Sequence, residues 1–194
     1  MNIKLFTAPT AEPIDLDEVK LHLRVDIDDD DTYIESLVVV AREYCEGVAN
    51  HRFITQTWDI VMDAFPGIGT LYLPKSLTPL VSVTHIKYTD EDDVQSTFSS
   101  ASYVVDIYSD PARIKLADDA NWPSDTLTEL NGIEIQIVVG YGDPEDVPQK
   151  YKQAIMLMAG HWYENREQVI SGEVPREIPM GVEALLWLDR NVPV

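Results

Sequence analysis

A run of carboxylates near the N-terminus is the part of this 194-residue chain best suited to bind a metal ion. Five of the six residues from Asp26 to Asp31 are aspartates, and Ca²⁺ and Mg²⁺ prefer carboxylate oxygens as ligands. The spacing does not fit an EF-hand loop, which needs a glycine at its sixth position and an acidic residue at its twelfth. A helical pattern begins directly after the run. We therefore interpret these carboxylates as charge at a helix N-terminus, where they interact favourably with the helix dipole, and we expect no metal.

Three other combinations of reactive residue types have simple structural interpretations. His161 and Glu164 share a helical face, but the sequence offers no third metal ligand beside them. Cys45 has no activating neighbour and lies in an apolar stripe, which is typical of an inert buried thiol. Gly140-Tyr141-Gly142 lacks the remaining glycine of a dinucleotide-binding loop and is expected to end a strand. We predict no catalytic residues, no cofactor and no enzymatic activity.

The segment HWYENRE, residues 161–167, has the residue types of a protein–protein contact instead. It ends an apolar stretch, residues 152–160, and a helix that is apolar all round must be buried on more than one side. Trp, Tyr and Arg are the residues that dominate interface hot spots. The predicted interface residues are His161, Trp162, Tyr163, Arg166, Trp187 and Arg190.

Alternatives stay open for three of these residues. Trp162 and Tyr163 could belong to the core of a single chain. Arg166 could complement the dipole at the end of its helix instead of pairing across an interface. Trp187 and Arg190 lie in the terminal segment, where a single-chain core is least expected, so partner contact is favoured there.

The charge balance limits the possible partners. The chain has 14 basic and 34 acidic residues, a net charge of −20 and a pI near 4.3. Binding of nucleic acid through Lys and Arg is therefore disfavoured. Residues 53–147 carry 4 basic and 16 acidic groups, whereas residues 148–194 carry 5 and 6. The nearly neutral C-terminal quarter is where we expect a docking surface.

Composition also indicates the compartment. A single cysteine excludes a disulfide framework and fits a reducing environment. No apolar run approaches the roughly 20 residues that span a bilayer, and the N-terminus lacks the order of a secretory signal. We expect a soluble protein made on the cytoplasmic side of a membrane, with no membrane partner.

Helical patterns lie at the two ends of the chain. Asp15 and Glu18 form a potential capping box for a helix over residues 16–24. The next helix follows the acidic run and has two adjacent apolar stripes, which again indicates contacts on two sides. The first stripe comprises Tyr33, Leu37, Val40, Ala41, Tyr44 and Val48, and the second comprises Ile34, Val38 and Cys45. A third helix is expected to start at residues 146–148 and a last one to cover residues 181–188.

Between the helices the hydrophobic period changes to two. The clearest strand has Ile133, Ile135, Ile137 and Val139 on one face. Similar alternation occurs at Trp58 to Met62, Val81 to Thr84, Tyr103 to Ile107 and Ile114 to Leu116, with turn residues between the runs. We predict an α+β fold: a small helical bundle core of two N-terminal and two C-terminal helices with an inserted antiparallel β module. The expected boundaries are 1–53, 54–147 and 148–194.

The chain resembles the phage head–tail connector (adaptor) family, in its long form with a β insertion. The matching stretches occur in order over nearly the whole sequence. They are IDLDEVKLHLRVD (14–26), FITQTWDIVMDAFP (53–66), LP (73–74), PLVSV (79–83), YVVD (103–106), NWP (121–123), GYGDPEDVP (140–148), KQAIMLMAGHWYENRE (152–167) and IPMGVEALL (178–186). The acidic residues 90–93 and 118–119 depart from the pattern, because this region is more acidic than expected for the family.

The resemblance implies a virion protein of the head–tail junction, or neck, assembled in the bacterial cytoplasm. Family members form a dodecameric ring beneath the portal, extend its DNA channel and receive a tail-side stopper, tail-terminator or tail-tube protein. Their C-terminal segment reaches the portal. DNA would pass through without sequence-specific binding, and an acidic wall would offer no cations to hold its phosphates. Asp28, Asp29, Asp30 and Asp31 are the expected channel-facing acids.

Two other classes of function remain open. An acidic DNA mimic or anti-restriction protein is the main alternative, because a net charge of −20 on a small chain can imitate duplex phosphates. Its acidity, however, is concentrated in predicted β loops and does not form regular rows. A metal-dependent hydrolase is the third class, and it would require affinity for Mg²⁺, Mn²⁺ or Ca²⁺.

Overall fold

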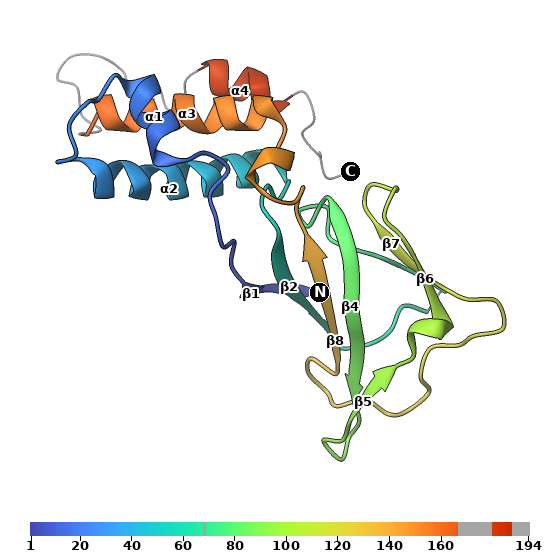
Figure 1. Cartoon of the computed structure of the whole chain (residues 1–194). Helices are drawn as coiled ribbons and strands as arrows, with labels where there is room; N and C mark the ends of the chain where they lie inside the picture. Colours follow the sequence, from blue (N-terminus) through green and yellow to red (C-terminus); the bar gives the residue numbers. More distant parts are fainter. Residues whose placement is uncertain (68, 167–179, 188–194) are drawn as a thin grey trace. The chain divides into compact units, whose positions relative to one another are not determined.

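The computed structural model describes residues 1–67, 69–166 and 180–187, and the chain folds as two compact units (Figure 1). Residues Met1–Pro9 and Thr55–Tyr141 form a unit built from β-strands, and Thr10–Ile54 with the chain from Gly142 onward form a unit built from helices. The fold is α+β, and an antiparallel β region separates the second helix from the third. The sequence prediction of the fold class is confirmed.

The two compact units group the chain differently from the predicted segments 1–53, 54–147 and 148–194, chiefly at the N-terminus and before the third helix. Residues Met1–Pro9 belong to the β unit, because Asn2–Thr7 forms strand β1 and pairs with a strand more than fifty residues later. Such a long-range pairing leaves no trace in local periodicity. Residues 142–147 belong to the helical unit, where the 3₁₀ turn η2 (Pro144–Asp146) precedes the third helix.

The β unit contains two antiparallel sheets. The larger has the order β1-β2-β8-β4-β5 and the smaller the order β3-β7-β6. The strands of the larger sheet are β1 (Asn2–Thr7), β2 (Gln56–Met62), β4 (Leu80–Thr89), β5 (Gln95–Phe98) and β8 (Ile133–Val139). Those of the smaller sheet are β3 (Thr70–Tyr72), β6 (Tyr103–Asp106) and β7 (Arg113–Leu116), with the 3₁₀ turn η1 (Ser100–Ser102) directly before β6.

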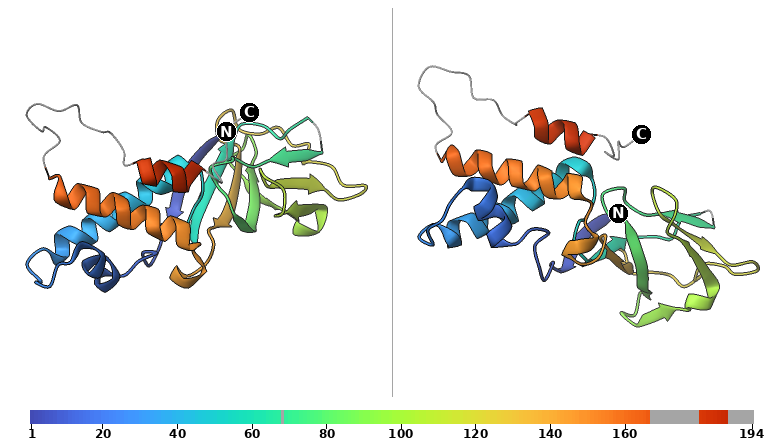
Figure 2. Two further views of the ribbon diagram at one scale, coloured as in Figure 1. Left: turned by 90° about the horizontal axis from the view of Figure 1, so that it is seen from above. Right: turned by 45° about the horizontal axis from the view of Figure 1, so that its top comes forward.

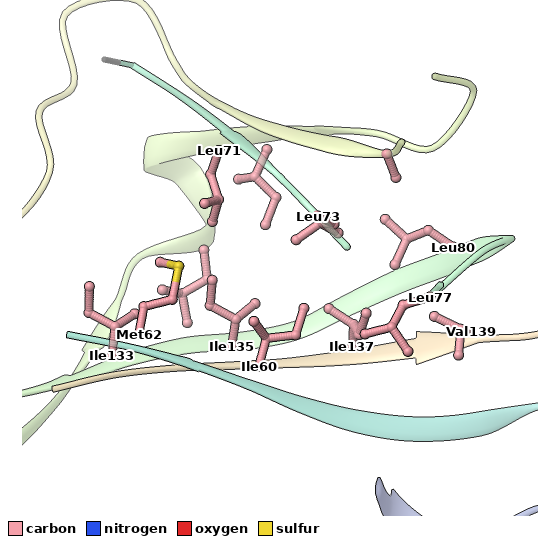
Figure 3. Close-up of a cluster of buried hydrophobic side chains, with 13 residues drawn as sticks. Ile60, Met62, Leu71, Leu73, Leu77, Leu80, Ile133, Ile135, Ile137 and Val139 are labelled. Atoms are coloured by element: carbon pink, nitrogen blue, oxygen red, sulfur yellow. The ribbon is translucent and has the colours of Figure 1, made fainter. Parts of the chain in front are cut away.

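Strand β8 is the central strand of the larger sheet, and it organises the core. Its isoleucines are fully buried on one face while Glu134 and Gln136 lie on the other, as the two-residue period predicts. The register places Ile135 between Ile60 of β2 and Ile86 of β4. Figure 3 shows these apolar side chains facing leucines such as Leu71 of the smaller sheet. The two sheets therefore share one hydrophobic core.

A cluster of aromatic rings packs beside this core. Phe65 stacks on Trp122 with centroids 5.0 Å apart, and Phe98 lies 5.4 Å from the same indole. Phe98 also stacks on Tyr103, at 5.9 Å. These rings come from loops and strand ends far apart in the sequence, so aromatic packing connects the loop around Trp122 to both sheets.

The helical unit consists of α1 (Leu16–Leu23), α2 (Asp31–Ala49), α3 (Gln149–Glu164) and α4 (Met180–Trp187). The predicted capping box of α1 is present: the Glu18 amide donates to Asp15 Oδ1 at 2.8 Å, and the Asp15 amide donates to Glu18 Oε2 at 3.4 Å. α3 begins one residue after Pro148, which stands at its N-cap. α4 spans 180–187, close to the predicted 181–188.

The helices bury their apolar residues mainly against one another. In α2 the stripe of Ile34, Val38 and Cys45 is buried, whereas the other stripe is half-buried apart from Ala41, which is buried, and Val40, which is 50% exposed. α3 packs against α1, α2 and α4, and Figure 2 shows α4 alongside α3 in both views. The apolar stretch of α3 therefore finds most of its cover within one chain, more than its sequence alone indicated.

Candidate interaction surface at the ends of the helices

The helices α2 and α3 run antiparallel, and this brings the start of α2 to the end of α3. Near the N-terminus of α3, Tyr151 stacks on Phe53, which lies just after the C-terminus of α2, with ring centroids 4.5 Å apart. Near the C-terminus of α3, the Tyr163 hydroxyl donates to Asp30 Oδ2 at 2.7 Å, and Arg166 Nη2 donates to the same oxygen at 2.8 Å. Two predicted interface residues and one predicted channel acid thus form one cluster within the chain.

Arg166 also lies over two aromatic rings in this cluster. Its guanidinium carbon is 4.8 Å from the centroid of Tyr33 and 5.2 Å from that of Tyr163, distances at which a cation is attracted to a ring face. Asp30 lies at the N-terminus of α2 and Arg166 follows the C-terminus of α3, so each charge also complements a helix dipole. The hydrogen bond from Tyr163 and the charge of Arg166 lower the pKa of Asp30.

The neighbouring acids of the run have a different partner. Lys20 Nζ lies 2.7 Å from Asp28 Oδ1 and 2.7 Å from Asp31 Oδ1. Hydrogen bonds to these two carboxylates raise the pKa of Lys20, and the bond from Lys20 lowers the pKa of Asp28. Asp30 stands at the N-cap position of α2 but makes no capping bond with its side chain. Asp29 is exposed and forms no ion pair with any described residue.

The remaining predicted residues of α3 are half-buried. Trp162 meets Tyr44 of α2 edge-on, with ring centroids 6.0 Å apart. The His161 carbonyl accepts from the Asn165 backbone and side-chain amides, at 3.1 and 2.8 Å, which closes the last turn of the helix. Trp162 is therefore partly a core residue, and its half-exposed ring adjoins the half-buried stripe of α2 that contains Tyr44.

The helix α4 ends in Trp187, one of the two C-terminal residues predicted to contact a partner. Trp187, the last residue of α4, is 63% exposed, and Met180 at the other end is 72% exposed. Val182 and Leu186 of the same helix are buried. α4 therefore covers the core with one face and presents apolar side chains on the other. Arg190 lies outside the described residues.

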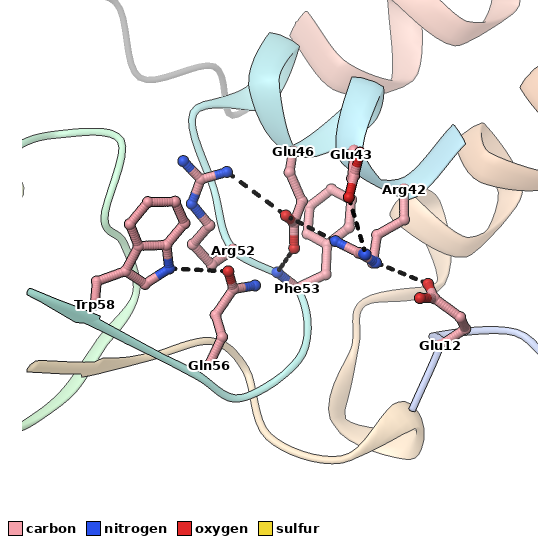
Figure 4. A network of polar contacts seen from close by, with 8 residues as sticks. All are labelled: Glu12, Arg42, Glu43, Glu46, Arg52, Phe53, Gln56 and Trp58. Carbon is pink, nitrogen blue, oxygen red and sulfur yellow. Dashed lines mark hydrogen bonds and ion pairs between the residues drawn. The ribbon is translucent and has the colours of Figure 1, made fainter. Parts of the chain in front are cut away.

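A buried ion network at the end of α2 has no counterpart in the sequence-based expectations (Figure 4). Arg42 Nε donates to Glu12 Oε2 at 2.7 Å and Arg42 Nη1 to Glu46 Oε2 at 3.2 Å. Glu46 Oε1 accepts the Phe53 amide at 2.8 Å, and Arg52 Nη1 lies 3.5 Å from Glu46 Oε2. The side chains of Arg42 and Glu46 are 6% and 3% exposed. Their spacing of four residues was a signal for an ion pair, but such pairs usually lie on the surface.

The structure also bears on the residues considered for chemistry. Cys45 is buried, and burial raises the pKa of its thiol to about 12, which fits an inert core residue. Within the described part of the chain, no group of three or more His, Cys, Asp or Glu side chains is arranged to hold a metal ion. Gly140 and Gly142 follow the end of β8 with φ of 122° and 138°, so they form the turn after a strand, as predicted. Among the described helices, none has the length and hydropathy to cross a membrane.

The helical unit and the antiparallel β unit, which is inserted between the second and third helices, define the class of this protein as α+β. The family described as phage gp6-like head-tail connector protein matches residues 13–109, which is half of the chain. The chain therefore belongs to the phage head–tail connector family, a family of structural virion proteins of the head–tail junction.

Solved structures share the fold over the full length. The chain matches a protein in the neck of an empty gene transfer agent (GTA) particle computed with C6 symmetry, at 25% identity and a TM-score of 0.80. The match covers 100% of this chain and 97% of that one. A protein in the neck of the native particle computed with C12 symmetry matches at 23% identity and a TM-score of 0.78, with the same coverage. No curated protein matches the chain.

Proposed function

We propose that this connector protein forms a homo-oligomeric ring of twelve copies in the neck of a phage-like particle, directly beneath the portal. The ring extends the DNA channel and provides the docking surface for a tail-side stopper, tail-terminator or tail-tube protein. The observation that carries the proposal is the full-length match, at a TM-score of 0.80, to a neck protein of a particle computed with C6 symmetry, together with the family assignment.

The surfaces of the helical unit support a role in assembly. The half-buried stripe of α2, with Val40 50% exposed, and the exposed Met180 and Trp187 of α4 leave apolar side chains for neighbours to cover. His161, Trp162, Tyr163 and Arg166 shape the end of the helical pair, and their exposed parts form a surface beside Asp30. With Trp187 and Arg190, these are the proposed subunit and portal contacts.

The net charge of −20 supports a channel that DNA passes without being held. Fixed cations would retain phosphates, whereas an acidic wall provides none. Asp28, Asp29, Asp30 and Asp31 are the proposed channel acids. Asp28 and Asp31 share Lys20, and Asp30 pairs with Arg166, so part of their charge is compensated. Among these four proposed channel acids, Asp29 forms no ion pair with any described residue, so its charge is not compensated there.

The first experiment is the solution mass by light scattering, for the protein alone and mixed with its cognate portal. A ring of twelve copies would weigh about 263 kDa (12 × 21.9 kDa). A mass near that value, or entry of the protein into the portal complex, is expected. A stable monomer that does not join the portal would contradict the proposal.

Two variants test the proposed surfaces. Truncation after Gly172 removes α4 and the terminal segment and is expected to abolish portal binding, so a shortened protein that still binds would exclude the docking role. Asp29→Lys is expected to impair DNA packaging or ejection. It changes charge without breaking an ion pair of the described residues, and unaltered phage yield would remove Asp29 from the channel.

The DNA-mimic alternative predicts a different result. An acidic mimic must displace DNA from a nuclease or other DNA-binding protein in a competition assay. We expect no displacement, because the family assignment favours a connector over a mimic of DNA.

A further inference from the structure

The outer face of the smaller sheet combines two cations with exposed apolar and aromatic side chains. The register aligns Tyr72 with Arg113 and Asp106 in one row, and Thr70 with Lys115 and Val104 in the next. The alternate residues Leu71 and Ile114 point into the core. Tyr72 is 51% and Val104 62% exposed, and Tyr108 in the loop after β6 is 95% exposed. We call Tyr72, Val104, Tyr108, Arg113 and Lys115 the basic face.

The basic face lies in a unit whose charged residues are mostly acidic. The β unit has five basic residues, Lys4, Lys75, Lys87, Arg113 and Lys115, against thirteen acidic ones, so its net charge is −8. Two of the five cations are neighbours on β7. Arg113 donates from Nε to Asp106 Oδ2 at 2.9 Å, and the carboxylate compensates its charge in part. Lys115 is exposed and forms no ion pair with any residue that the structure describes.

A surface of the opposite sign lies elsewhere on the same unit, at the turn between β4 and β5. The turn from Asp90 to Val94 is hydrogen-bonded to the loop over residues 125–131: the Glu91 amide donates to the Thr126 carbonyl at 3.1 Å, and the Thr128 amide to the Thr89 carbonyl at 3.1 Å. The Asp90 carboxylate accepts the Val94 amide at 2.9 Å, which fixes the turn. The acidic end, as we call it, exposes Glu91, Asp92, Asp93, Val94, Asp125, Glu129 and Leu130.

The acidic end also exposes apolar side chains. Val94 is 56% and Leu130 73% exposed. Both surfaces therefore have apolar groups among charges, the anatomy of a protein interface with a charged rim, and the charges have opposite signs. They come from different elements: β3, β6 and β7 form the basic face, and the β4–β5 turn with the loop before β8 forms the acidic end.

We propose that the basic face of one copy binds the acidic end of the next copy in the ring. This inference rests on the proposed ring. A closed ring of identical subunits needs two different surfaces that complement each other, because each contact is head-to-tail. The two surfaces of the β unit meet this requirement in charge and in apolar content. The charge pairing selects the register between copies that otherwise repel through their net charge of −20 each.

A second copy fits the basic face better than DNA does. Phosphate-binding surfaces neutralise several phosphates with Lys and Arg, whereas here one of two cations already pairs with Asp106. The unit around the face is acidic and repels a polyanion over a longer range than two cations attract it. A neighbouring acidic end offers apolar groups for Tyr72 and Val104 as well as charge.

Charge reversal in one chain tests the contact. Lys115→Glu and Asp92→Lys each place like charges across the interface, and each is expected to raise the protein concentration at half-assembly by about tenfold or more. The double variant restores the pair with reversed sign and is expected to return to within about threefold of the wild type. Assembly is followed by light scattering, with the portal present if the wild type needs it.

Lys4→Glu is the matched control, because it makes the same charge change on β1, outside both surfaces. It is expected to assemble within about threefold of the wild type, and thermal unfolding should show all variants folded. Equal assembly of the wild type and both single variants would overturn the inference while leaving the ring intact. The same holds if Lys4→Glu weakens assembly as much as Lys115→Glu.

Two further outcomes would also contradict the inference. If Lys115→Glu reduces retention of a labelled DNA duplex and leaves assembly unchanged, the basic face is a DNA contact and the inference is wrong. If the wild type forms no ring either alone or on the portal, the proposed function fails, and this inference fails with it.

Discussion

Glu46 is the carboxylate shared by most of the buried contacts at the end of α2. It accepts from Arg42 and from the Phe53 amide, and Arg52 lies within ion-pair distance. Replacing it with alanine leaves a buried guanidinium and a buried amide without this acceptor. Loss of one partner of a buried ion pair costs about 3–5 kcal/mol. We expect Glu46→Ala to lower the free energy of unfolding by that amount, measured by denaturant titration.

Glu46→Gln is the matched variant for the same position. The amide oxygen of glutamine can still accept from Phe53, but the charge that compensates Arg42 is absent. We expect a loss that is smaller than in Glu46→Ala but still measurable. If both variants unfold at the wild-type denaturant concentration, the network contributes nothing to stability.

Asp106 gives a pH-dependent contribution to the stability of the β unit. Hydrogen bonds from the Ser109 hydroxyl and from nearby backbone amides, together with Arg113, lower the pKa of its carboxyl to about 2. The unfolded carboxyl titrates near 3.8, so between these values the unfolded chain binds more protons and stability increases with pH. The contribution is complete above pH 3.8 and is lost as the pH falls toward 2.

The corresponding variant is Asp106→Asn. Its thermal unfolding midpoint is expected to lie below that of the wild type at neutral pH, and the gap is expected to narrow as the pH falls from about 4 to about 2. Circular dichroism at several pH values measures this. A gap that stays constant with pH would show that the ionised carboxylate is not what stabilises the β6–β7 hairpin.

The cluster of Asp30, Tyr163 and Arg166 could not be predicted from the sequence. The sequence shows that Asp30 and Arg166 have opposite charges. It does not show that α2 and α3 run antiparallel, which places these two residues at the same end of the helical pair. The sequence therefore predicts Tyr163 and Arg166 as interface residues without revealing their partners within the chain. Their role in subunit contact remains a prediction, and the structure adds that they also hold the two helices together.

Two glycines on the helices differ in what surrounds them. A Cβ added at Gly47 of α2 would meet no atom within 4 Å, whereas one at Gly160 of α3 would lie 3.3 Å from Leu23 Cδ2 of α1. Alanine is favoured over glycine within a helix by about 0.5–1 kcal/mol. We expect Gly47→Ala to stabilise the protein by that amount and Gly160→Val to destabilise it by about 1–3 kcal/mol through overpacking against α1.

Denaturant titration of the two variants checks both signs. The result would contradict the described packing of α1 on α3 if Gly160→Val were as stable as the wild type. It would contradict the exposure of Gly47 if Gly47→Ala were destabilised.

At the scale of elements, local patterns were sufficient for most of the fold. The capping box of α1, the buried face of β8 and the turn after it follow from neighbours in sequence. Strand β1 and the aromatic cluster around Trp122 do not, because their partners are distant in the chain and meet only after folding. The predicted strand over Tyr103 to Ile107 is one residue too long. The apolar alternation continues through Ile107, but β6 ends at Asp106, and the Asp106 side chain accepts the Tyr108 amide in the turn that follows.

The net negative charge of each copy opposes the assembly of copies into a ring. In the proposed ring, twelve copies with a net charge of −20 each repel at long range, and the proposed contact must overcome this repulsion locally. Opposite charges placed at the contact, and apolar groups among them, are the two physical means available. If the portal supplies further contact area, as proposed, ring formation on a portal will need less protein than ring formation in solution.

Self-repulsion also predicts how the stability of a single chain depends on salt. The chain has 34 acidic groups and 14 basic ones, so compaction brings like charges together, and this cost falls as ions screen them. Raising the ionic strength from about 10 to about 150 mM shortens the screening length from about 30 to about 8 Å. We expect the thermal unfolding midpoint to rise over this range when KCl is added to the monomer. Ion pairs such as Lys20 with Asp28 weaken in salt and oppose the rise. A midpoint that falls with KCl would therefore mean that these pairs outweigh the repulsion, and the acidic surface would then be far less costly to the fold than its net charge implies.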